Sequence, residues 1–183
     1  MRETRKAAFG FVQKRLFLFR DSAIYQGTIK MAGLYFEDFE PGRIYQHEVT
    51  RTITQSDGIQ YALMCMETEP TYIDEDWAKH HARFRRIEVY PLYVLAIIMG
   101  VQVTELTQGT TLGNLAMGDV KFPNPVFPGD SLRGQTTILG KKESKTKFDR
   151  GVVEFLHEGF NQHGELVATC LRKGMMLRRI ASR

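Results

Sequence analysis

Five carboxylates surround a proline and a tyrosine in the stretch MCMETEPTYIDEDWA, residues 64–78. The acids are Glu67, Glu69, Asp74, Glu75 and Asp76, and Tyr72 lies among them. Carboxylates held close together can exchange protons with a substrate as general acid and base. Tyrosine is a poor base at neutral pH, because its ordinary pKa is about 10. The stretch is an acid–base site, an altered one, or a solvated acidic loop.

Several polar residues after Tyr72 have simpler interpretations. We expect Asp74 to fix the geometry of a turn and Glu75 and Asp76 to be solvated charges in the first turn of a helix, where carboxylates are favourable. His80 and His81 are adjacent and point to different helix faces, so at most one could supply an imidazole to a site. We expect no metal site, because no histidine pair four residues apart or neighbouring cysteine completes a ligand set.

A strand and a short helix are predicted to lead into the acidic stretch. RIYQHEVTRTIT, residues 43–54, is rich in β-branched residues and predicts one strand, with Val49 and Ile53 on one face. Thr54 and Asp57 have the spacing of a capping box, which predicts a helix start. Apolar side chains then recur at helical spacing, at Ile59, Leu63 and Met66.

The segment YPLYVLAIIMGVQVTEL, residues 90–106, predicts a buried helix. Pro91 suits the first turn, and apolar side chains point in nearly every direction, so the helix must be wrapped. Four predicted strands follow, at 110–122, 130–148, 150–160 and 165–179, and the last two are joined by a turn at 161–164. The order predicts an α+β fold in which an antiparallel sheet is wrapped around a long buried helix.

Composition and charge exclude several classes of protein. The chain has 183 residues, 43% hydrophobic and 25% charged, which is typical of a globular domain. Its net charge of +4 comes from residues 1–32, which hold seven basic and two acidic residues, +5, and leave −1 for the rest. The body therefore lacks the basic surface of a nucleic-acid binder. The longest apolar run, 92–101, is too short to cross a membrane, which takes about 20 residues.

Residues 1–32 form a basic, aromatic N-terminal extension. We interpret it as an arm that packs on a partner subunit, a poorly ordered extension, or translation from an unused upstream start. A transit peptide is disfavoured, because Glu3 and Asp21 are present and serine is scarce. Cys65 and Cys170 are too few for a secreted disulfide framework. We therefore expect a reducing, cytoplasmic compartment.

Four motifs resemble the MaoC-like hydratases of the hot-dog fold, most closely the branch acting on small branched acyl-CoAs of the mesaconyl- or itaconyl-CoA kind. They are YFEDFEPG at 35–42, FPNPVFPGDSLRG at 122–134, GKKESKTK at 140–147 and GFNQHGELVATC at 159–170. The resemblance implies a hot-dog domain over residues 33–183 and a CoA thioester as substrate or ligand, with no other cofactor. It also implies a homodimer, or a heterodimer with another hot-dog subunit.

The resemblance gives the acidic stretch a register. Hydratases of this family add water across the double bond of a 2-enoyl thioester, and an Asp or Asn and a His hold the water. In this chain Glu67 and Tyr72 stand at those acid–base positions, and Glu69 replaces a family Asn expected to contact substrate. Pro70 and Asp74 match the family pattern. The resemblance thus implies a hydratase site with altered catalytic residues.

A second altered segment precedes the buried helix. The family has a Phe-Gly-Arg-Pro-like turn there, followed by a helix start whose amides polarise the thioester carbonyl. This chain places Arg85 at the glycine, and Tyr90 and Pro91 at the helix start. Proline removes one amide donor from the first turn. The resemblance implies that Arg85, Tyr90 and Pro91 line the substrate site.

Three functions stay open. The chain is an active hydratase or dehydratase, a lyase with Glu67 as base and Tyr72 as donor or positioning group. It is alternatively a non-catalytic subunit, a pseudoenzyme whose pocket is closed by a tyrosine–carboxylate hydrogen bond. The third function is an acyl-CoA thioesterase that uses Glu67.

Two sets of basic residues lie outside the acidic stretch, and neither has a definite catalytic role. Lysines at 140–147 either meet the phosphates of CoA or protect a strand edge from pairing, and they are Lys141, Lys142, Lys145 and Lys147. His157, in mid-strand, and His163, in the hairpin turn, are expected to be exposed.

Overall fold

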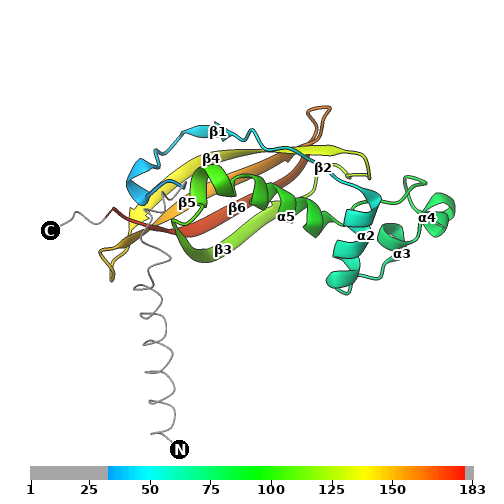
Figure 1. The fold of residues 1–183 in the computed structure, drawn as a ribbon, viewed down its shortest axis with the longest axis horizontal. Helices are drawn as coiled ribbons and strands as arrows, with labels where there is room; N and C mark the ends of the chain where they lie inside the picture. The colour runs from blue at the N-terminus through cyan, green and yellow to red at the C-terminus, as the bar shows by residue number, and fades with distance from the viewer. Residues whose placement is uncertain (1–32, 180–183) are drawn as a thin grey trace, which may run out of the picture. The chain divides into compact units, whose positions relative to one another are not determined.

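The computed structural model describes residues 33–179, so the predicted extension 1–32 lies outside the described residues (Figure 1). Its strands are β1 (Ile44–Gln46), β2 (Arg51–Thr52), β3 (Thr111–Lys121), β4 (Ser131–Glu143), β5 (Arg150–Phe160) and β6 (Leu166–Leu177). Its helices are η2 (Phe36–Asp38), α2 (Gln55–Met64), α3 (Pro70–Ile73), α4 (Glu75–His81), α5 (Pro91–Val101) and η3 (Val103–Thr107). Figure 1 shows α5 lying along one face of the sheet, with α2, α3 and α4 grouped at one end.

All strand pairs are antiparallel, in the order β1-β4-β5-β6-β3, and β2 also pairs with β4. The four predicted long strands and the α+β architecture are confirmed. The turn between β5 and β6 is confirmed as well. Gly164 adopts φ +80° there, and its amide donates to the carbonyl oxygen of Asn161 at 3.1 Å. Glycine takes this left-handed conformation without steric cost.

Glycines in the sheet let α5 approach closely. A Cβ on Gly159 would lie 2.4 Å from Ile98 Cδ1, and one on Gly134 would lie 2.6 Å from Val101 Cγ2. The sequence predicted that this helix is wrapped on every side. That prediction was wrong, because Leu92 is 45% exposed. The sheet buries the side that carries Val94 and Ile98. The rest of α5 is left for another surface to cover.

The predicted strand over 43–54 is broken into β1 and β2. Gln46 pairs with Gln135 and Arg51 pairs with Leu132. The segment is therefore five residues further on where β4 is only three residues further on. The surplus residues cannot join the ladder and form a bulge. His47 follows β1 directly and continues its alternation, so it points into the interior and is 7% exposed.

A polar row lies beneath the end of α5. His47 Nδ1 is 2.7 Å from Glu105 Oε2, and its Nε2 is 2.8 Å from Thr136 Oγ1. Thr136 Oγ1 is in turn 2.9 Å from His157 Nδ1. The expectation that His157 is exposed was wrong, because it is fully buried. Burial, the positive charge of Arg172 and the nearby His47 lower the pKa of His157 to about 3.

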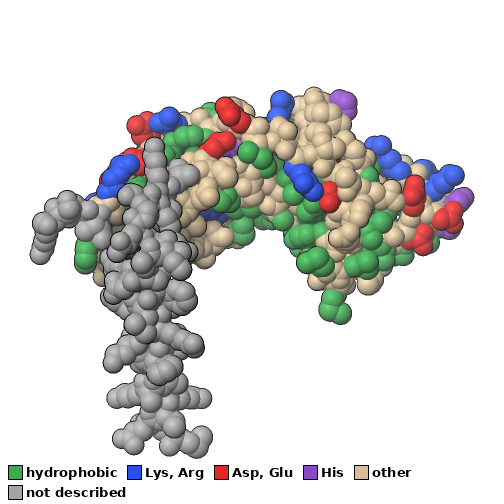
Figure 2. Space-filling view, in the orientation of Figure 1, with side chains coloured by type: hydrophobic (Ala, Val, Ile, Leu, Met, Phe, Trp, Pro, Cys, Tyr) green, Lys and Arg blue, Asp and Glu red, His purple; other side chains and the backbone are tan. Residues whose placement is uncertain are grey.

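Helix α2 begins as predicted, because Thr54 and Asp57 form a reciprocal capping box. Of the apolar side chains at helical spacing, Ile59 packs against a buried cluster that includes Ile87, whereas Leu63 and Met66 are 51% and 87% exposed. The fully buried positions are Gly58 and Ala62. A Cβ on Gly58 would be in ordinary van der Waals contact with Val89 Cγ2, at 3.9 Å. Figure 2 shows apolar side chains gathered on the surface at this end of the domain.

Strand β3 is an exposed edge. It pairs with β6 on one side, and each of its residues is exposed. Several of these are large and apolar, namely Leu112, Leu115, Met117 and Val120. A long apolar strand edge is a template for pairing with another chain.

Within residues 33–179, no helix is long and apolar enough to span a membrane.

Candidate active site

The acidic stretch folds as a turn and two short helices that follow α2. Met66 adopts the left-handed φ of 59°, and the amide of Glu67 donates to the carbonyl oxygen of Ala62 at 2.9 Å. Pro70 occupies the first turn of α3. Asp74 then accepts a 2.9 Å hydrogen bond from the amide of Trp77 at the start of α4. The expected turn-fixing role of Asp74 is thus confirmed.

Glu67 is half-buried, and its carboxylate is turned toward its own loop. Its Oε1 accepts a hydrogen bond of 2.9 Å from the backbone amide of Glu69. The Glu69 side chain is exposed. One carboxylate is therefore held in a fixed position while the other faces solvent.

Tyr72 is half-buried beside Tyr90, with the two ring centroids 5.3 Å apart. Burial raises the pKa of Tyr72, and the negative charges of Glu88 and Glu67 raise that pKa further. A higher pKa makes the phenol a weaker acid, so it keeps its proton at neutral pH. Tyr72 can therefore donate a hydrogen bond to a substrate oxygen, but it is not the base.

Glu88 is a candidate acid–base residue that the sequence did not single out. Its backbone amide donates to the carbonyl oxygen of Thr71 at 3.1 Å, which places it beside the Tyr72 segment. Burial raises the pKa of Glu88, although the charges of Arg83 and Arg86 oppose that rise. A carboxyl group with a raised pKa is suited to proton transfer near neutral pH. The one feature of the sequence that could have indicated Glu88 is its position between two hydrophobic residues, Ile87 and Val89, which are both buried.

Glu88 lines a narrow hollow of about 210 Å³ at the start of α5. The hollow has apolar walls from Val89, Pro91 and Val94 on one side and Val126 on the other. Pro91 thus lines the same hollow as Glu88. Arg83 and Asn124 line the same hollow, so the Glu88 carboxyl lies among both apolar and polar groups.

The helix start offers few amide donors. Pro91 has no N–H, and the amide of Tyr93 already donates to the carbonyl oxygen of Tyr90 at 2.9 Å. Tyr90 itself makes no side-chain capping hydrogen bond. This helix start therefore has fewer free amides with which to polarise a carbonyl group.

Arg85 occupies a position with a backbone suited to glycine. Its φ of 54° lies in the left-handed region, which costs a residue with a Cβ on the order of 1–2 kcal/mol. Its guanidinium donates to the carbonyl oxygen of His80, near the end of α4. The side chain therefore points to α4. His80 and His81 are both exposed, and His81 stacks against Trp77.

The sheet that packs on α5 has the hot-dog fold of the MaoC-like hydratase family. A putative MaoC domain dehydratase from Chloroflexus aurantiacus superposes with a TM-score of 0.76 at 26% identity, over 86% of this chain and 44% of that chain. A MaoC-like dehydratase from Rhodospirillum rubrum superposes with a TM-score of 0.70 at 27% identity, over 81% of this chain and 99% of that chain.

The chain belongs to the mesaconyl-CoA hydratase family, whose sequence model matches residues 19–183. The mesaconyl-CoA hydratase of Cereibacter sphaeroides is 28% identical over 148 residues, which cover 81% of this chain and 42% of the relative. The chain thus spans less than half the length of that relative.

Within residues 33–179, no group of three or more His, Cys, Asp and Glu side chains could hold a metal ion.

Proposed function

We propose that this protein hydrates a 2-enoyl-CoA thioester, or dehydrates the corresponding 3-hydroxyacyl-CoA, with Glu67 and Glu88 as its acid–base groups. The observation that carries the proposal is the 3.1 Å hydrogen bond from the Glu88 amide to the carbonyl oxygen of Thr71, which places Glu88 beside the segment of Tyr72. The charges of Glu88 and Glu67 both raise the pKa of Tyr72. Mesaconyl-CoA is the first substrate to test, because a mesaconyl-CoA hydratase is among the similar proteins.

The two carboxylates divide the proton transfers. In hydration Glu67 takes a proton from water while the water oxygen bonds to C3 of the enoyl group. Glu88, whose raised pKa favours the protonated form, gives its proton to C2. Exchange with solvent returns a proton to Glu88 and removes one from Glu67. Tyr72 donates a hydrogen bond that positions the thioester.

We infer that a second copy of the chain pairs along β3. The strand edge is open and apolar, and part of α5 is uncovered. The mesaconyl-CoA hydratase of Cereibacter sphaeroides is more than twice as long as the part of it that this chain matches, which leaves room there for a second unit. Oligomers of identical chains are most often two-fold symmetric dimers.

A non-catalytic subunit that binds acyl-CoA is the second candidate function. The Glu67 carboxylate is engaged by its own loop, and Tyr72 replaces the family histidine with a group that keeps its proton. Such a subunit would pair with an active hot-dog hydratase through β3.

The test incubates the purified chain with mesaconyl-CoA and with crotonyl-CoA. Loss of the enoyl thioester absorbance is followed together with free CoA, which a thiol reagent detects. The proposal predicts loss of absorbance without thiol release. Thiol release in proportion to substrate loss would identify a thioesterase. Binding without either change would identify a non-catalytic subunit.

A further inference from the structure

The turn between α4 and α5 carries three arginines in four residues, Arg83, Arg85 and Arg86. All three are exposed. The ion pairs formed among residues 33–179 include none of them. The turn is therefore a concentrated positive charge that forms no direct ion pair in the described part of the chain, although the charges of Arg83 and Arg86 act on nearby Glu88.

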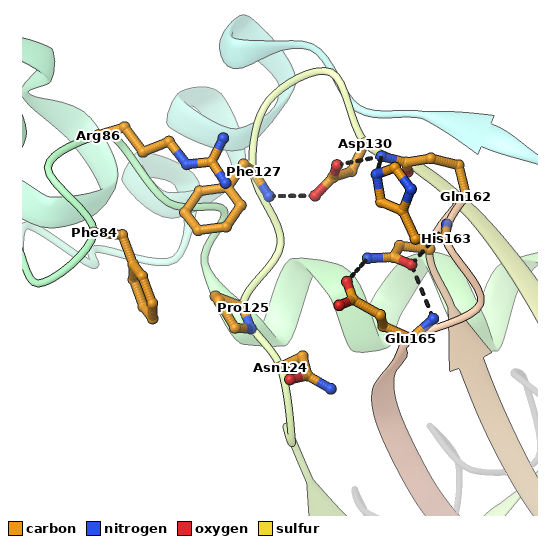
Figure 3. A pocket seen from close by; sticks show the side chains of 10 residues that line it. Phe84, Arg86, Asn124, Pro125, Phe127, Asp130, Gln162, His163 and Glu165 are labelled. Atoms are coloured by element: carbon orange, nitrogen blue, oxygen red, sulfur yellow. Dashed lines mark hydrogen bonds between the residues drawn. The ribbon is translucent and has the colours of Figure 1, made fainter.

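Aromatic rings hold two of these guanidinium groups in place. Arg86 Cζ lies 3.2 Å from the centroid of the Phe127 ring, and Arg83 Cζ lies 5.0 Å from that of Phe84. Figure 3 shows Arg86 lying beside Phe127, with Phe84 close by. A guanidinium that rests on a ring keeps its in-plane N–H groups for other acceptors. Phosphate oxygens match this planar fork.

Two hollows meet at this turn. The narrow hollow that contains Glu88 shares Phe84, Asn124 and Pro125 with a larger hollow of about 660 Å³. A cavity of this size is within the range of about 300–1,000 Å³ typical of small-molecule sites. Its lining is polar and includes Arg86, Asn161, Gln162 and His163.

The carboxylates of the larger hollow are already engaged. Asp130 accepts hydrogen bonds of 2.8 Å from the amide of Phe127 and from Gln162 Nε2. Glu165 accepts one of 2.7 Å from Asn161 Nδ2 (Figure 3). Their negative charges keep phosphates away from the interior and leave the arginine rim as the favourable place. Amide and carboxylate groups can still bond the polar edges of a base and a ribose.

The lysines of 140–147 do not reach this place in the same chain. Ser131 lies at the larger hollow, where its amide donates to Gln162 Oε1 at 2.9 Å. Lys141 is ten residues further along β4, so it is about 33 Å away at about 3.3 Å per residue. Lys141 also donates to the carbonyl oxygens of Phe36 and Glu37 at 3.2 and 3.0 Å. This lysine therefore holds η2 onto the sheet.

We propose that Arg83 and Arg86 bind the phosphates of a CoA thioester, with the base and ribose in the larger hollow. The pantetheine arm then crosses Phe84 and Asn124, and the thioester enters the hollow that contains Glu88. This inference rests on the proposed CoA thioester as ligand. It adds the part of the molecule that recognises the nucleotide end.

The test measures binding of CoA and of pantetheine to the full chain by titration calorimetry. Because a charge-assisted hydrogen bond to phosphate is lost, Arg86→Gln should raise the Kd for CoA roughly tenfold or more, and Arg83→Gln/Arg86→Gln should raise it further. The Kd for pantetheine should stay unchanged. CoA binding should also weaken with added salt, less so in the double variant.

Arg43→Gln is the matched control. Arg43 is also an exposed arginine over an aromatic ring, 4.8 Å from the Tyr45 centroid, and it lies beside Ile138, away from both hollows. Equal weakening by Arg43→Gln, equal loss of pantetheine binding, or absence of CoA binding by the wild type would overturn the inference. Unfolding midpoints of all variants verify that each is folded.

Failure of the proposed function gives a different result. Turnover of an enoyl-pantetheine, which lacks the nucleotide, tests the chemistry without the arginine turn. If the wild type hydrates enoyl-pantetheine and Arg86→Gln leaves CoA binding intact, the inference fails and the function stands. If nothing is hydrated but CoA binding depends on Arg86, the function fails and the inference stands.

Discussion

The backbone amide of Glu88 donates a 3.1 Å hydrogen bond to the carbonyl oxygen of Thr71. This bond joins the segment before α5 to the segment that carries Tyr72, although the two residues are 17 positions apart in the sequence. It brings a second carboxylate to a site where the family pattern placed an acid and a histidine. The charges of Glu67 and Glu88 both raise the pKa of Tyr72, and the proposed mechanism uses these two carboxylates as its acid–base groups.

The buried His157 predicts that stability falls in acid. Its pKa is lowered to about 3 from an ordinary value of 6.5, so the unfolded chain binds a proton that the folded chain excludes. The contribution is complete above pH 6.5 and is lost as the pH falls toward 3. The free energy of unfolding should decline by on the order of 1 kcal/mol for each pH unit in that window.

His157→Gln should remove this part of the pH dependence, because glutamine stays neutral and can still reach Thr136. Urea unfolding at a series of pH values measures it. His163→Gln, at an exposed turn, is the control and should keep the wild-type slope. Identical slopes for the two variants would contradict the account.

The left-handed φ of Arg85 predicts an unusual order of stabilities. Arg85→Gly should unfold with a free energy about 1 kcal/mol higher than Arg85→Ala, since both lose the bond to His80 and glycine alone relieves the strain. The same pair of substitutions at Arg83, which is not among the residues with positive φ, should give the opposite order. Equal or reversed values at Arg85 would show that its backbone is not strained.

The exposed edge strand predicts a dimer. Leu115, in β3, is 52% exposed, and a charge placed there would be buried without a partner in a β3 interface. Leu115→Lys should raise the dimer dissociation constant at least tenfold, as measured by analytical ultracentrifugation. Val49→Lys, at a position 47% exposed and outside β3, should keep the wild-type mass. Dimers of equal strength in both variants would place the interface elsewhere.

Local rules predicted much of the fold. The starts of α2 and α5 and the hairpin turn were predicted correctly, because each has a residue type that the local backbone requires. These are Thr54 with Asp57, Pro91, and Gly164. The burial of His157 could have been predicted as well. It alternates with Val153 and Phe155 on the inner face of β5. We expected His157 to be exposed because it is polar, whereas its position in the alternating pattern of the strand predicts burial.

The site was only partly predictable. The register of Glu67 and Tyr72 followed from a family motif, whereas Glu88 belongs to none. Its raised pKa comes from burial, which only the folded chain brings about. The same holds for Arg86, whose ring contact comes from Phe127 on a distant loop.

The most direct test of the central claim is the rate of mesaconyl-CoA hydration by the wild type, Glu67→Gln and Glu88→Gln. General acid–base groups contribute about 10²- to 10⁴-fold, so each variant should lose at least about 100-fold in kcat. Asp76→Asn, whose side chain is 91% exposed, is the control and should keep the wild-type rate. A wild type without turnover, or full activity in both glutamine variants, would contradict the account.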